Sequence, residues 1–294
     1  MRIRNILYVF ALVFMFVNCK YKVGCEYSTK KEVNKKEVLK KCKLIAHRGG
    51  IVEAKFNEYD PRSIQAAIDQ NYYMLEIDIR ESKDGVLVVN HDGDFTRFFN
   101  NVSMVKDLTW DEIKQLKSDK GNYHPISFES LAKMCEGKIK LMIDLKLKNP
   151  TSDYYKKIGD ILEKYNLFEG AFFINKEARK YYWGKAKFEF RVNERIEIER
   201  KLDAGEDIAS NYFLFDRGNR LTTEAVMFCQ INNIEIIPMI NIGHYIYEDH
   251  MKGAHRDIEY WKSCGVTEFL IDSDYDRWLS SGEFNSRKKK DEKN

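Results

Sequence analysis

Seven side chains that could move protons, bind phosphate or hold a cation stand at the ends of four consecutive apolar segments: His47, Arg48, Glu76, Asp78, His91, Asp144 and Lys146. A single histidine after a strand is more often structural than catalytic. Four such segments in a row are harder to explain by core packing, because buried charges are costly unless they are paired or bound to a metal. The pattern indicates one polar site that is assembled from several strands.

Three of these residues are carboxylates that must lie close together in such a site. Glu76 and Asp78 are two residues apart, and so are Asp144 and Lys146, so each pair projects from one face of a strand. At about 4 Å and an effective dielectric of about 20, two carboxylates repel each other by about 4 kcal/mol. A hard divalent cation with oxygen ligands, Ca²⁺ or Mg²⁺, relieves this repulsion. Neutralisation by Lys146 and Arg48 without a metal is the alternative.

The elements that position these residues alternate between strand-like and helix-like segments. Nine segments are short, largely apolar and rich in β-branched or aromatic residues, as buried parallel strands are. They are 43–47, 74–80, 86–90, 139–146, 171–175, 187–192, 212–216, 234–241 and 268–272. Helix signals lie between most of them, such as Pro61 after Asp60 and the capping box of Thr109 and Glu112.

This alternation over residues 43–278 predicts one (β/α)₈ TIM-type barrel, which typically takes about 250 residues. An open doubly wound sheet is the alternative, but no glycine-rich phosphate loop follows the first strand. In a barrel, catalytic groups collect at the carboxyl ends of the strands, where the polar residues stand here. The barrel is expected to be irregular, with a short insertion between the third and fourth strands.

The second and third strands are too close in sequence for a crossover helix, because only residues 81–85 separate them. We therefore expect an antiparallel hairpin with a four-residue turn at 82–85. That turn pairs Arg80 with Leu87 and, further along, Glu76 with His91.

The N-terminal residues 1–18 have the pattern of an export signal. Arg2 and Arg4 precede an apolar run over 6–17, which is shorter than the about 20 residues of a membrane-spanning helix. A short uncleaved membrane anchor is the alternative. Cys19 stands where a lipoprotein signal places its acylated cysteine, although the residues before it fit that signal poorly. We expect an exported protein, periplasmic or at the cell surface, with Cys19 as a candidate lipid anchor.

The chain on either side of the barrel is rich in charge. Residues 19–42 form a lysine-rich tether that could associate with membrane headgroups, and residues 279–294 form a charged tail expected to be disordered. A net charge of +3 over 294 residues argues against nucleic-acid binding, which needs a concentrated basic face. The six cysteines contain no CxxC pair, which argues against a zinc site. Nothing in the sequence fixes an oligomeric state.

The polar segments, taken in order, resemble the glycerophosphodiester phosphodiesterase family. The resemblance rests on residues 44–49 (LIAHRG), 75–79 (LEIDI), 83–89 (KDGVLVV), 91–92 (HD) and 141–146 (LMIDLK). It covers positions 43 to 146 and weakens afterwards, although 269–272 (FLID) resembles the family's last strand.

The resemblance implies a TIM-type barrel that hydrolyses glycerophosphodiesters, small-molecule substrates, to glycerol 3-phosphate and an alcohol. It assigns His47 and His91 as general acid and base. It further implies one divalent cation, Ca²⁺ or Mg²⁺, and a phosphate-binding pair. The metal ligands would be Glu76, Asp78 and Asp144, and the phosphate would be bound by Arg48 and Lys146.

Three departures from the family pattern bear on the substrate. The family's Pro-Glu-Asn-Thr is replaced by Pro-Arg-Ser-Ile at 61–64, its third metal carboxylate is Asp144 in place of Glu, and its late Trp-Thr-Val-Asn reads Pro-Met-Ile-Asn at 238–241. Two further functions are therefore considered: a phospholipase C/D-like phosphodiesterase acting on a lipid, and a non-catalytic surface protein that binds phosphodiesters. The two histidines argue against the second, because a binding protein needs no acid–base pair.

Overall fold

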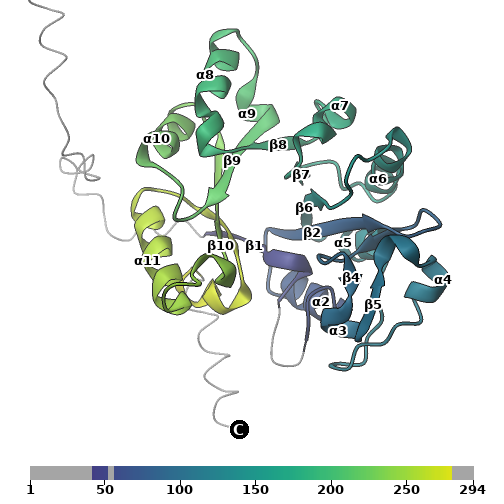
Figure 1. The fold of residues 1–294 in the computed structure, drawn as a ribbon. Coiled ribbons are helices and arrows are strands. Elements are labelled where there is room, and N and C mark those ends of the chain that lie inside the picture. The colour runs from purple at the N-terminus through teal and green to yellow at the C-terminus, as the bar shows by residue number, and fades with distance from the viewer. Residues whose placement is uncertain (1–41, 52–55, 280–294) are drawn as a thin grey trace, which may run out of the picture. The chain divides into compact units, whose positions relative to one another are not determined.

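A closed ring of eight parallel strands forms the centre of the computed structural model, which describes residues 42–51 and 56–279 (Figure 1). The ring runs β1-β2-β6-β7-β8-β9-β10-β11 and closes where β11 pairs with β1. Its strands are β1 Lys43–Ala46, β2 Met74–Glu81, β6 Lys140–Leu145, β7 Phe172–Phe173, β8 Lys187–Phe190, β9 Tyr212–Arg217, β10 Glu235–Ile240 and β11 Glu268–Ile271. The predicted (β/α)₈ TIM-type barrel is confirmed.

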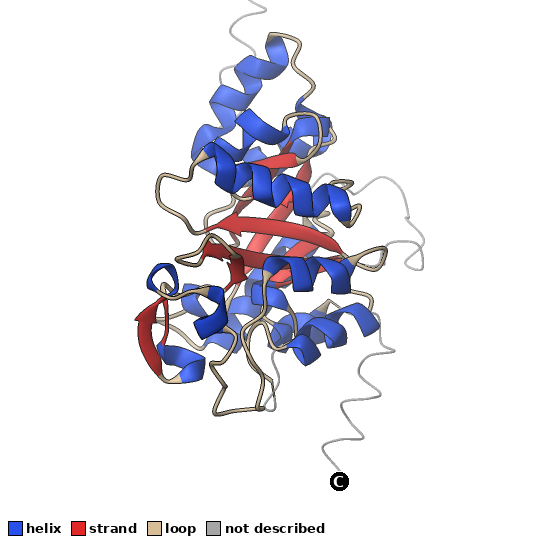
Figure 2. Ribbon diagram, turned by 90° about the vertical axis from the view of Figure 1, so that its right-hand side faces the viewer, coloured by secondary structure: helices blue, strands red, loops and turns tan. Residues whose placement is uncertain are grey.

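Helices cover the outside of the ring, as Figure 2 shows for the blue helices around the red strands. They are α2 Pro61–Asp69, α5 Phe128–Cys135, α6 Ser152–Lys164, α7 Arg179–Tyr182, α8 Arg195–Asp203, α9 Ile208–Asn211, α10 Thr223–Ile231 and α11 His250–Ser263. Short 3₁₀ turns follow several strands: η1 His47–Gly49, η3 Lys176–Ala178, η4 Val192–Glu194, η5 Ile242–His244 and η6 Ser273–Trp278. Asp60 caps α2 by accepting a hydrogen bond from the Arg62 amide, as the sequence predicts.

The inside of the ring is filled by apolar side chains from seven of its strands: Ile45, Met74, Met142, Phe172, Phe213, Phe215, Ile237 and Leu270. Side chains alternate between the two faces of a strand, so the residues two and four positions after Met74 also face inward. These are Glu76 and Asp78, and Asp144 follows Met142 in the same way. These apolar side chains therefore lie directly beneath the polar site inside the barrel.

The hairpin between β2 and β3 (Leu87–Val89) is present and antiparallel, but its predicted register is wrong by one residue. Glu81 pairs with Leu87 and Ile79 with Val89. The turn has three residues. The Gly85 amide donates to the Ser82 carbonyl at 3.0 Å, and Gly85 itself takes a left-handed conformation, with φ +83°, which lets the chain reverse one residue earlier than predicted. The ladder ends at Val89, so Glu76 and His91 are not a cross-strand pair.

The insertion between β3 and β6 carries a small subdomain of its own. It contains β4 Asp94–Phe95, α3 Thr96–Phe99, β5 Asn101–Met104, η2 Val105–Asp107 and α4 Trp110–Ile113. The two strands form an antiparallel pair that the sequence pattern did not predict, because two to four residues are too few to show a period. The capping box at Thr109 is confirmed. Buried aromatic rings, among them Phe95, Phe99 and Tyr123, form the core of the subdomain.

The predicted export signal, most of the lysine-rich tether and the charged tail lie outside the described residues. Within residues 42–51 and 56–279, no helix is both long and apolar enough to cross a bilayer.

Candidate active site

Three carboxylates meet at the carboxyl ends of neighbouring strands. Oxygen atoms of Glu76, Asp78 and Asp144 all lie within 4.8 Å of one another. β2 and β6 pair in register, with Asp78 opposite Asp144, so the two acidic strands bring their side chains to the same height in the barrel. All the donors are carboxylate oxygens, which suits a hard cation such as Ca²⁺ or Mg²⁺. The three predicted metal ligands are thus brought together.

Lys146 lies against two of the three carboxylates. Its Nζ is 2.9 Å from Asp78 Oδ1 and 2.5 Å from Asp144 Oδ2. Burial raises the pKa of Asp78, but Lys146 and the Tyr59 hydroxyl, which donates to Asp78 Oδ2, together hold it below its usual value. One lysine therefore compensates Asp78 and Asp144 but makes no ion pair with Glu76.

Glu76 is the carboxylate without a cationic partner. Burial, together with the charges of Asp78 and Asp144, raises its pKa well above the usual value. The backbone amide of Arg48 donates a hydrogen bond to Glu76 Oε2 at 2.8 Å. Neutralisation by lysine and arginine side chains is thus incomplete at Glu76, and this buried carboxylate fits a site that takes a divalent cation.

The turn that follows β1 aims the Arg48 amide at this cluster. Arg48 has a left-handed backbone conformation, with φ +50° and ψ +52°. Gly49 follows with φ +75°, where an added Cβ would lie 2.4 Å from the Tyr59 ring. Glycine is required at this position because Tyr59 packs directly on the turn and reaches Asp78 with its hydroxyl.

The Arg48 guanidinium contacts both Glu58 and His91. One nitrogen donates to Glu58 Oε1 at 2.9 Å, and the other lies 3.0 Å from His91 Nε2. Because guanidinium can only donate, His91 Nε2 is the acceptor and its proton is on Nδ1. The Arg48 Nε is buried without a hydrogen-bond partner among the described residues, so it is a donor available to an anion.

Carboxylates hold the Nδ1 atoms of both histidines. His47 Nδ1 lies 2.6 Å from Asp272 Oδ1, and the other oxygen of Asp272 accepts from the Ile242 amide at 2.7 Å. His91 Nδ1 lies 2.8 Å from Asp92 Oδ1. A carboxylate thus orients each ring through Nδ1, and the Nε2 of His91 meets the Arg48 guanidinium.

Sequence reasoning missed four residues of this site: Glu58, Tyr59, Asp92 and Asp272. Asp272 could have been found, because it directly follows the last barrel strand as His47 follows the first. Asp92 belongs to the quoted His-Asp pair but was given no role. Glu58 and Tyr59 lie in a loop between β1 and α2, where no periodic pattern places a side chain.

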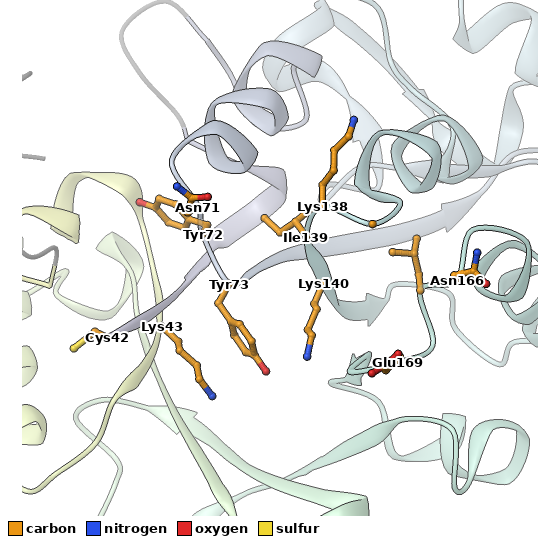
Figure 3. Close-up of a pocket in the computed structure, with 12 residues that line it drawn as sticks. Cys42, Lys43, Asn71, Tyr72, Tyr73, Lys138, Ile139, Lys140, Asn166 and Glu169 are labelled. Atoms are coloured by element: carbon orange, nitrogen blue, oxygen red, sulfur yellow. The ribbon is translucent and has the colours of Figure 1, made fainter. Parts of the chain in front are cut away.

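A pocket lies at the opposite end of the barrel. This pocket of about 600 Å³ is lined at the amino ends of the strands, and Figure 3 shows Lys43, Tyr73 and Lys140 pointing into it from one side. The two ammonium groups lie 4.7 and 5.2 Å from the centre of the Tyr73 ring. The pocket lacks the carboxylate cluster and both site histidines, so we place the chemistry at the carboxyl ends.

Comparison with known proteins agrees with this arrangement. The sequence profile of the glycerophosphoryl diester phosphodiesterase family matches residues 47–200, which is more than half of the chain. The chain belongs to this family. The matched segment begins at His47 and contains all seven residues that the sequence pattern singled out.

Curated relatives match over a shorter segment. The protein YhdW of Bacillus subtilis (strain 168) is 30% identical over 135 residues, which are 42% of this chain and 52% of that protein. A glycerophosphodiester phosphodiesterase of Bacillus altitudinis is 25% identical over 134 residues, 42% of this chain and 54% of that enzyme. The chain thus matches about half of the length of these curated relatives.

Solved structures share the fold over most of the chain. A glycerophosphoryl diester phosphodiesterase of Parabacteroides distasonis superposes with a TM-score of 0.66 at 18% identity, covering 82% of this chain and 88% of that one. An Oleispira antarctica phosphodiesterase in complex with the product sn-glycerol-3-phosphate superposes with a TM-score of 0.60 at 17% identity, covering 79% and 94%. At these identities the likeness establishes the barrel architecture.

Proposed function

We propose that this protein is a metal-dependent phosphodiesterase that hydrolyses glycerophosphodiesters to glycerol 3-phosphate and an alcohol. The observation that carries the proposal is the cluster of Glu76, Asp78 and Asp144 with both histidines beside it, each held through Nδ1 by a carboxylate. Family membership and a product-bound relative support glycerol 3-phosphate as the product.

In this proposal the chain's own residues divide the work. A phosphodiester is an anion that repels nucleophiles, so Arg48 and Lys146 bind its non-bridging oxygens and offset their charge. A divalent cation held by Glu76, Asp78 and Asp144 supplies further positive charge at the phosphoryl group. The buried, unpartnered Nε of Arg48 is the donor that an incoming phosphate oxygen satisfies.

The two imidazoles have different roles. His91 Nε2 accepts a hydrogen bond from Arg48, so Nε2 carries no proton there, and it can take a proton from the attacking water once the Arg48 guanidinium turns to the phosphate. His47 is then the acid that protonates the leaving alcohol, with Asp272 stabilising its protonated form. The sequence left these two roles open, and the hydrogen bond from Arg48 favours this assignment.

A panel assay tests the function. Glycerophosphocholine, glycerophosphoethanolamine and lysophosphatidylcholine are incubated with the protein and either Ca²⁺, Mg²⁺ or chelator, and the phosphomonoester is identified by mass spectrometry. We expect glycerol 3-phosphate from the first two substrates, one oxygen from labelled water in its phosphate, and no product with chelator. Release of phosphocholine in place of glycerol 3-phosphate, or binding without turnover, would reject the proposal.

We also propose that the chain is exported and held at the membrane through Cys19, on the basis of the signal-like residues 1–18. Cell fractionation is the test. A Cys19→Ala variant should move from the membrane to the soluble exported fraction, and a full-length chain in the cytoplasm would contradict export.

A further inference from the structure

Arg217 is the last residue of β9, at the carboxyl end of the barrel where the proposed active site lies. Phe213 and Phe215 of this strand face into the barrel, so Arg217, two residues further on, faces inward as well. Its side chain is half-buried. Among residues 42–51 and 56–279, no carboxylate forms an ion pair with its guanidinium, and no hydrogen bond involves that group. A guanidinium in this situation is a candidate anion-binding group.

Other basic side chains that face the mouth of the barrel are already compensated. Each has a carboxylate partner: Arg48 with Glu58 at 2.9 Å, Lys146 with Asp144 at 2.5 Å, and Arg191 with Glu189 at 2.6 Å. Arg191 directly follows β8, and its guanidinium lies 4.8 Å from the centre of the Phe215 ring. Arg191 and Arg217 therefore belong to the same side of the mouth, which carries an excess of positive charge.

The segment after β10 packs beside Arg217. Met239 of β10 is the strand neighbour of Arg217 in the barrel. The Met239 carbonyl accepts from the amide of Gly218, the residue after Arg217, at 3.0 Å, and His244 Nδ1 lies 3.1 Å from the same oxygen. One carbonyl therefore holds His244 at the strand end that carries Arg217.

His244 lies between Arg217 and the proposed acid, His47. Burial lowers the pKa of His244 to about 4, and the charges of Arg217 and His47 both contribute to this lowering. Asp272, the carboxylate that also acts on His244, is occupied: Oδ1 lies 2.6 Å from His47 Nδ1, and Oδ2 accepts from the Ile242 amide at 2.7 Å. Arg217 is thus near the acid without sharing its carboxylate.

This position decides which part of a substrate Arg217 meets. His47 is proposed to protonate the leaving alcohol, so that alcohol lies on the side of the mouth that carries His47, His244 and Arg217. A guanidinium binds a carboxylate or a phosphate with two parallel hydrogen bonds. It repels a cationic group such as choline. The charge at this side of the mouth therefore favours an alcohol that is itself an anion.

We propose that Arg217 determines specificity by binding an anionic group, a carboxylate or a phosphate, on the leaving alcohol of the substrate. This inference rests on the proposed function and specifies its substrate class. The reaction is unchanged: water attacks phosphorus, the phosphorus–oxygen bond to the alcohol breaks, and the alcohol oxygen takes a proton from His47.

Two substrate pairs test this proposal. Glycerophosphoserine differs from glycerophosphoethanolamine by one carboxylate on the leaving alcohol, and glycerophosphoinositol 4-phosphate differs from glycerophosphoinositol by one phosphate. For the wild type we expect kcat/KM to be at least about tenfold higher for the anionic member of one pair or both, as one charge-assisted hydrogen bond implies. A preference in a single pair identifies the group that is bound. Equal kcat/KM within both pairs would overturn the proposal.

Variants of Arg217 locate the preference. In Arg217→Met the ratio should fall below about twofold, and in Arg217→Glu it should reverse in favour of glycerophosphoethanolamine. Arg217→Lys keeps the charge and should retain part of the preference, and circular dichroism checks that each variant is folded. A preference that survives in Arg217→Met would reject the role of this residue.

Lys138→Met is the matched control. Lys138 is exposed and lines the pocket at the amino end of the barrel, so this variant also removes one positive charge but far from the mouth. It should keep the full preference. An equal loss in Lys138→Met would assign the preference to the net charge of the protein and reject the proposal.

A binding series separates this inference from the proposed function. The same four compounds are titrated calorimetrically, with Ca²⁺, into the wild type and Arg217→Met. If none of them is cleaved, the proposed function fails, but tighter binding of the anionic member that is lost in Arg217→Met still supports the role of Arg217. Equal binding within both pairs rejects that role whatever the turnover.

Discussion

His47 and His91 are held by the same kind of contact, but their surroundings differ. Asp272 contacts His47 from the end of the last barrel strand and is itself fixed by a backbone amide. Asp92 contacts His91 from the adjacent residue and is paired with Arg97 at 2.6 Å. Burial raises the pKa of Asp272, but the hydrogen bond with His47 and its charge outweigh burial and hold this pKa below its usual value. Asp272 is therefore an ionised partner that can stabilise a protonated His47.

Asp272→Asn tests this positioning role. The substitution keeps the shape of the side chain but removes the charge that stabilises a protonated His47, so kcat should fall at least about tenfold while KM changes little. The basic limb of the pH–rate profile should also shift to lower pH, because His47 must be protonated to act as the acid and loses the anionic partner that stabilises this form. Equal losses in kcat at all pH values, with an altered circular dichroism spectrum, would indicate a structural role instead.

His244 gives a prediction for stability against pH. Burial and Arg217 lower its folded-state pKa to about 4 from an ordinary 6.5, so the unfolded chain binds this proton at a higher pH than the folded chain does. Above about pH 6.5, His244 is neutral in both states and does not change the free energy of unfolding with pH. As the pH falls from 6.5 towards 4, the unfolded chain takes up the proton first, so the free energy of unfolding decreases. In His244→Gln, the loss of unfolding free energy between pH 7.5 and pH 5 should be smaller than in the wild type.

Urea denaturation at the two pH values measures this difference. His255→Gln, at an exposed position of α11, is the control and should lose as much stability as the wild type. An unchanged loss in His244→Gln would contradict the account of this residue.

At the scale of elements, the backbone conformation of the turn after β1 positions residues of the proposed site. Gly50 has φ +136°, and an added Cβ would lie 2.4 Å from the backbone carbonyl of Ser63 in α2. The same turn places the Arg48 amide on Glu76. The close approach of this turn to α2 therefore fixes both Arg48, the proposed phosphate-binding residue, and Glu76, a proposed metal ligand.

Gly50→Ala should destabilise the fold by more than about 2 kcal/mol and lower activity, because neither the backbone conformation nor the contact with Ser63 can accept a side chain. Gly137→Ala is the matched control. Gly137 also has a positive φ, +65°, but an added Cβ there meets nothing within 4 Å, so the cost should be only about 1 kcal/mol. Equal destabilisation of the two variants would show that the contact with Ser63 is unimportant.

The strands could be predicted from the sequence, but the hairpin register and the loop contacts could not. All nine predicted strands are present, because buried barrel strands are continuous apolar runs that residue types reveal directly. The hairpin was predicted from the spacing of β2 and β3, but its register depended on the backbone conformation of Gly85. The roles of Glu58 and Tyr59 depend on tertiary contacts with Arg48 and Asp78, which no local pattern encodes.

At the scale of the whole molecule, the barrel brings together carboxylates that are far apart in the sequence. Their mutual repulsion lowers the stability of the folded protein. Glu76, Asp78 and Asp144 are close, and one lysine compensates two of them. A cation that binds only the folded protein should therefore stabilise it. At about 100 times its dissociation constant, a ligand adds about 2.7 kcal/mol of stability, which raises Tm by about 5–10 °C in a domain of this size.

Thermal unfolding with and without Ca²⁺ or Mg²⁺ checks this expectation. Asp78→Ala should abolish the rise in Tm, whereas Asp111→Ala, which removes an exposed carboxylate of α4, should leave it intact. A rise that persists in Asp78→Ala would place the cation elsewhere.

The most direct test of the proposed chemistry is the rate of glycerol 3-phosphate release from glycerophosphocholine by His47→Ala/His91→Ala at saturating divalent cation. Each imidazole contributes about 10²–10⁴-fold as an acid or base, so the double variant should lose at least about 10³-fold in kcat. Its cation-dependent rise in Tm should remain, because the three carboxylates are intact. A double variant that releases glycerol 3-phosphate within tenfold of the wild-type rate would contradict the account.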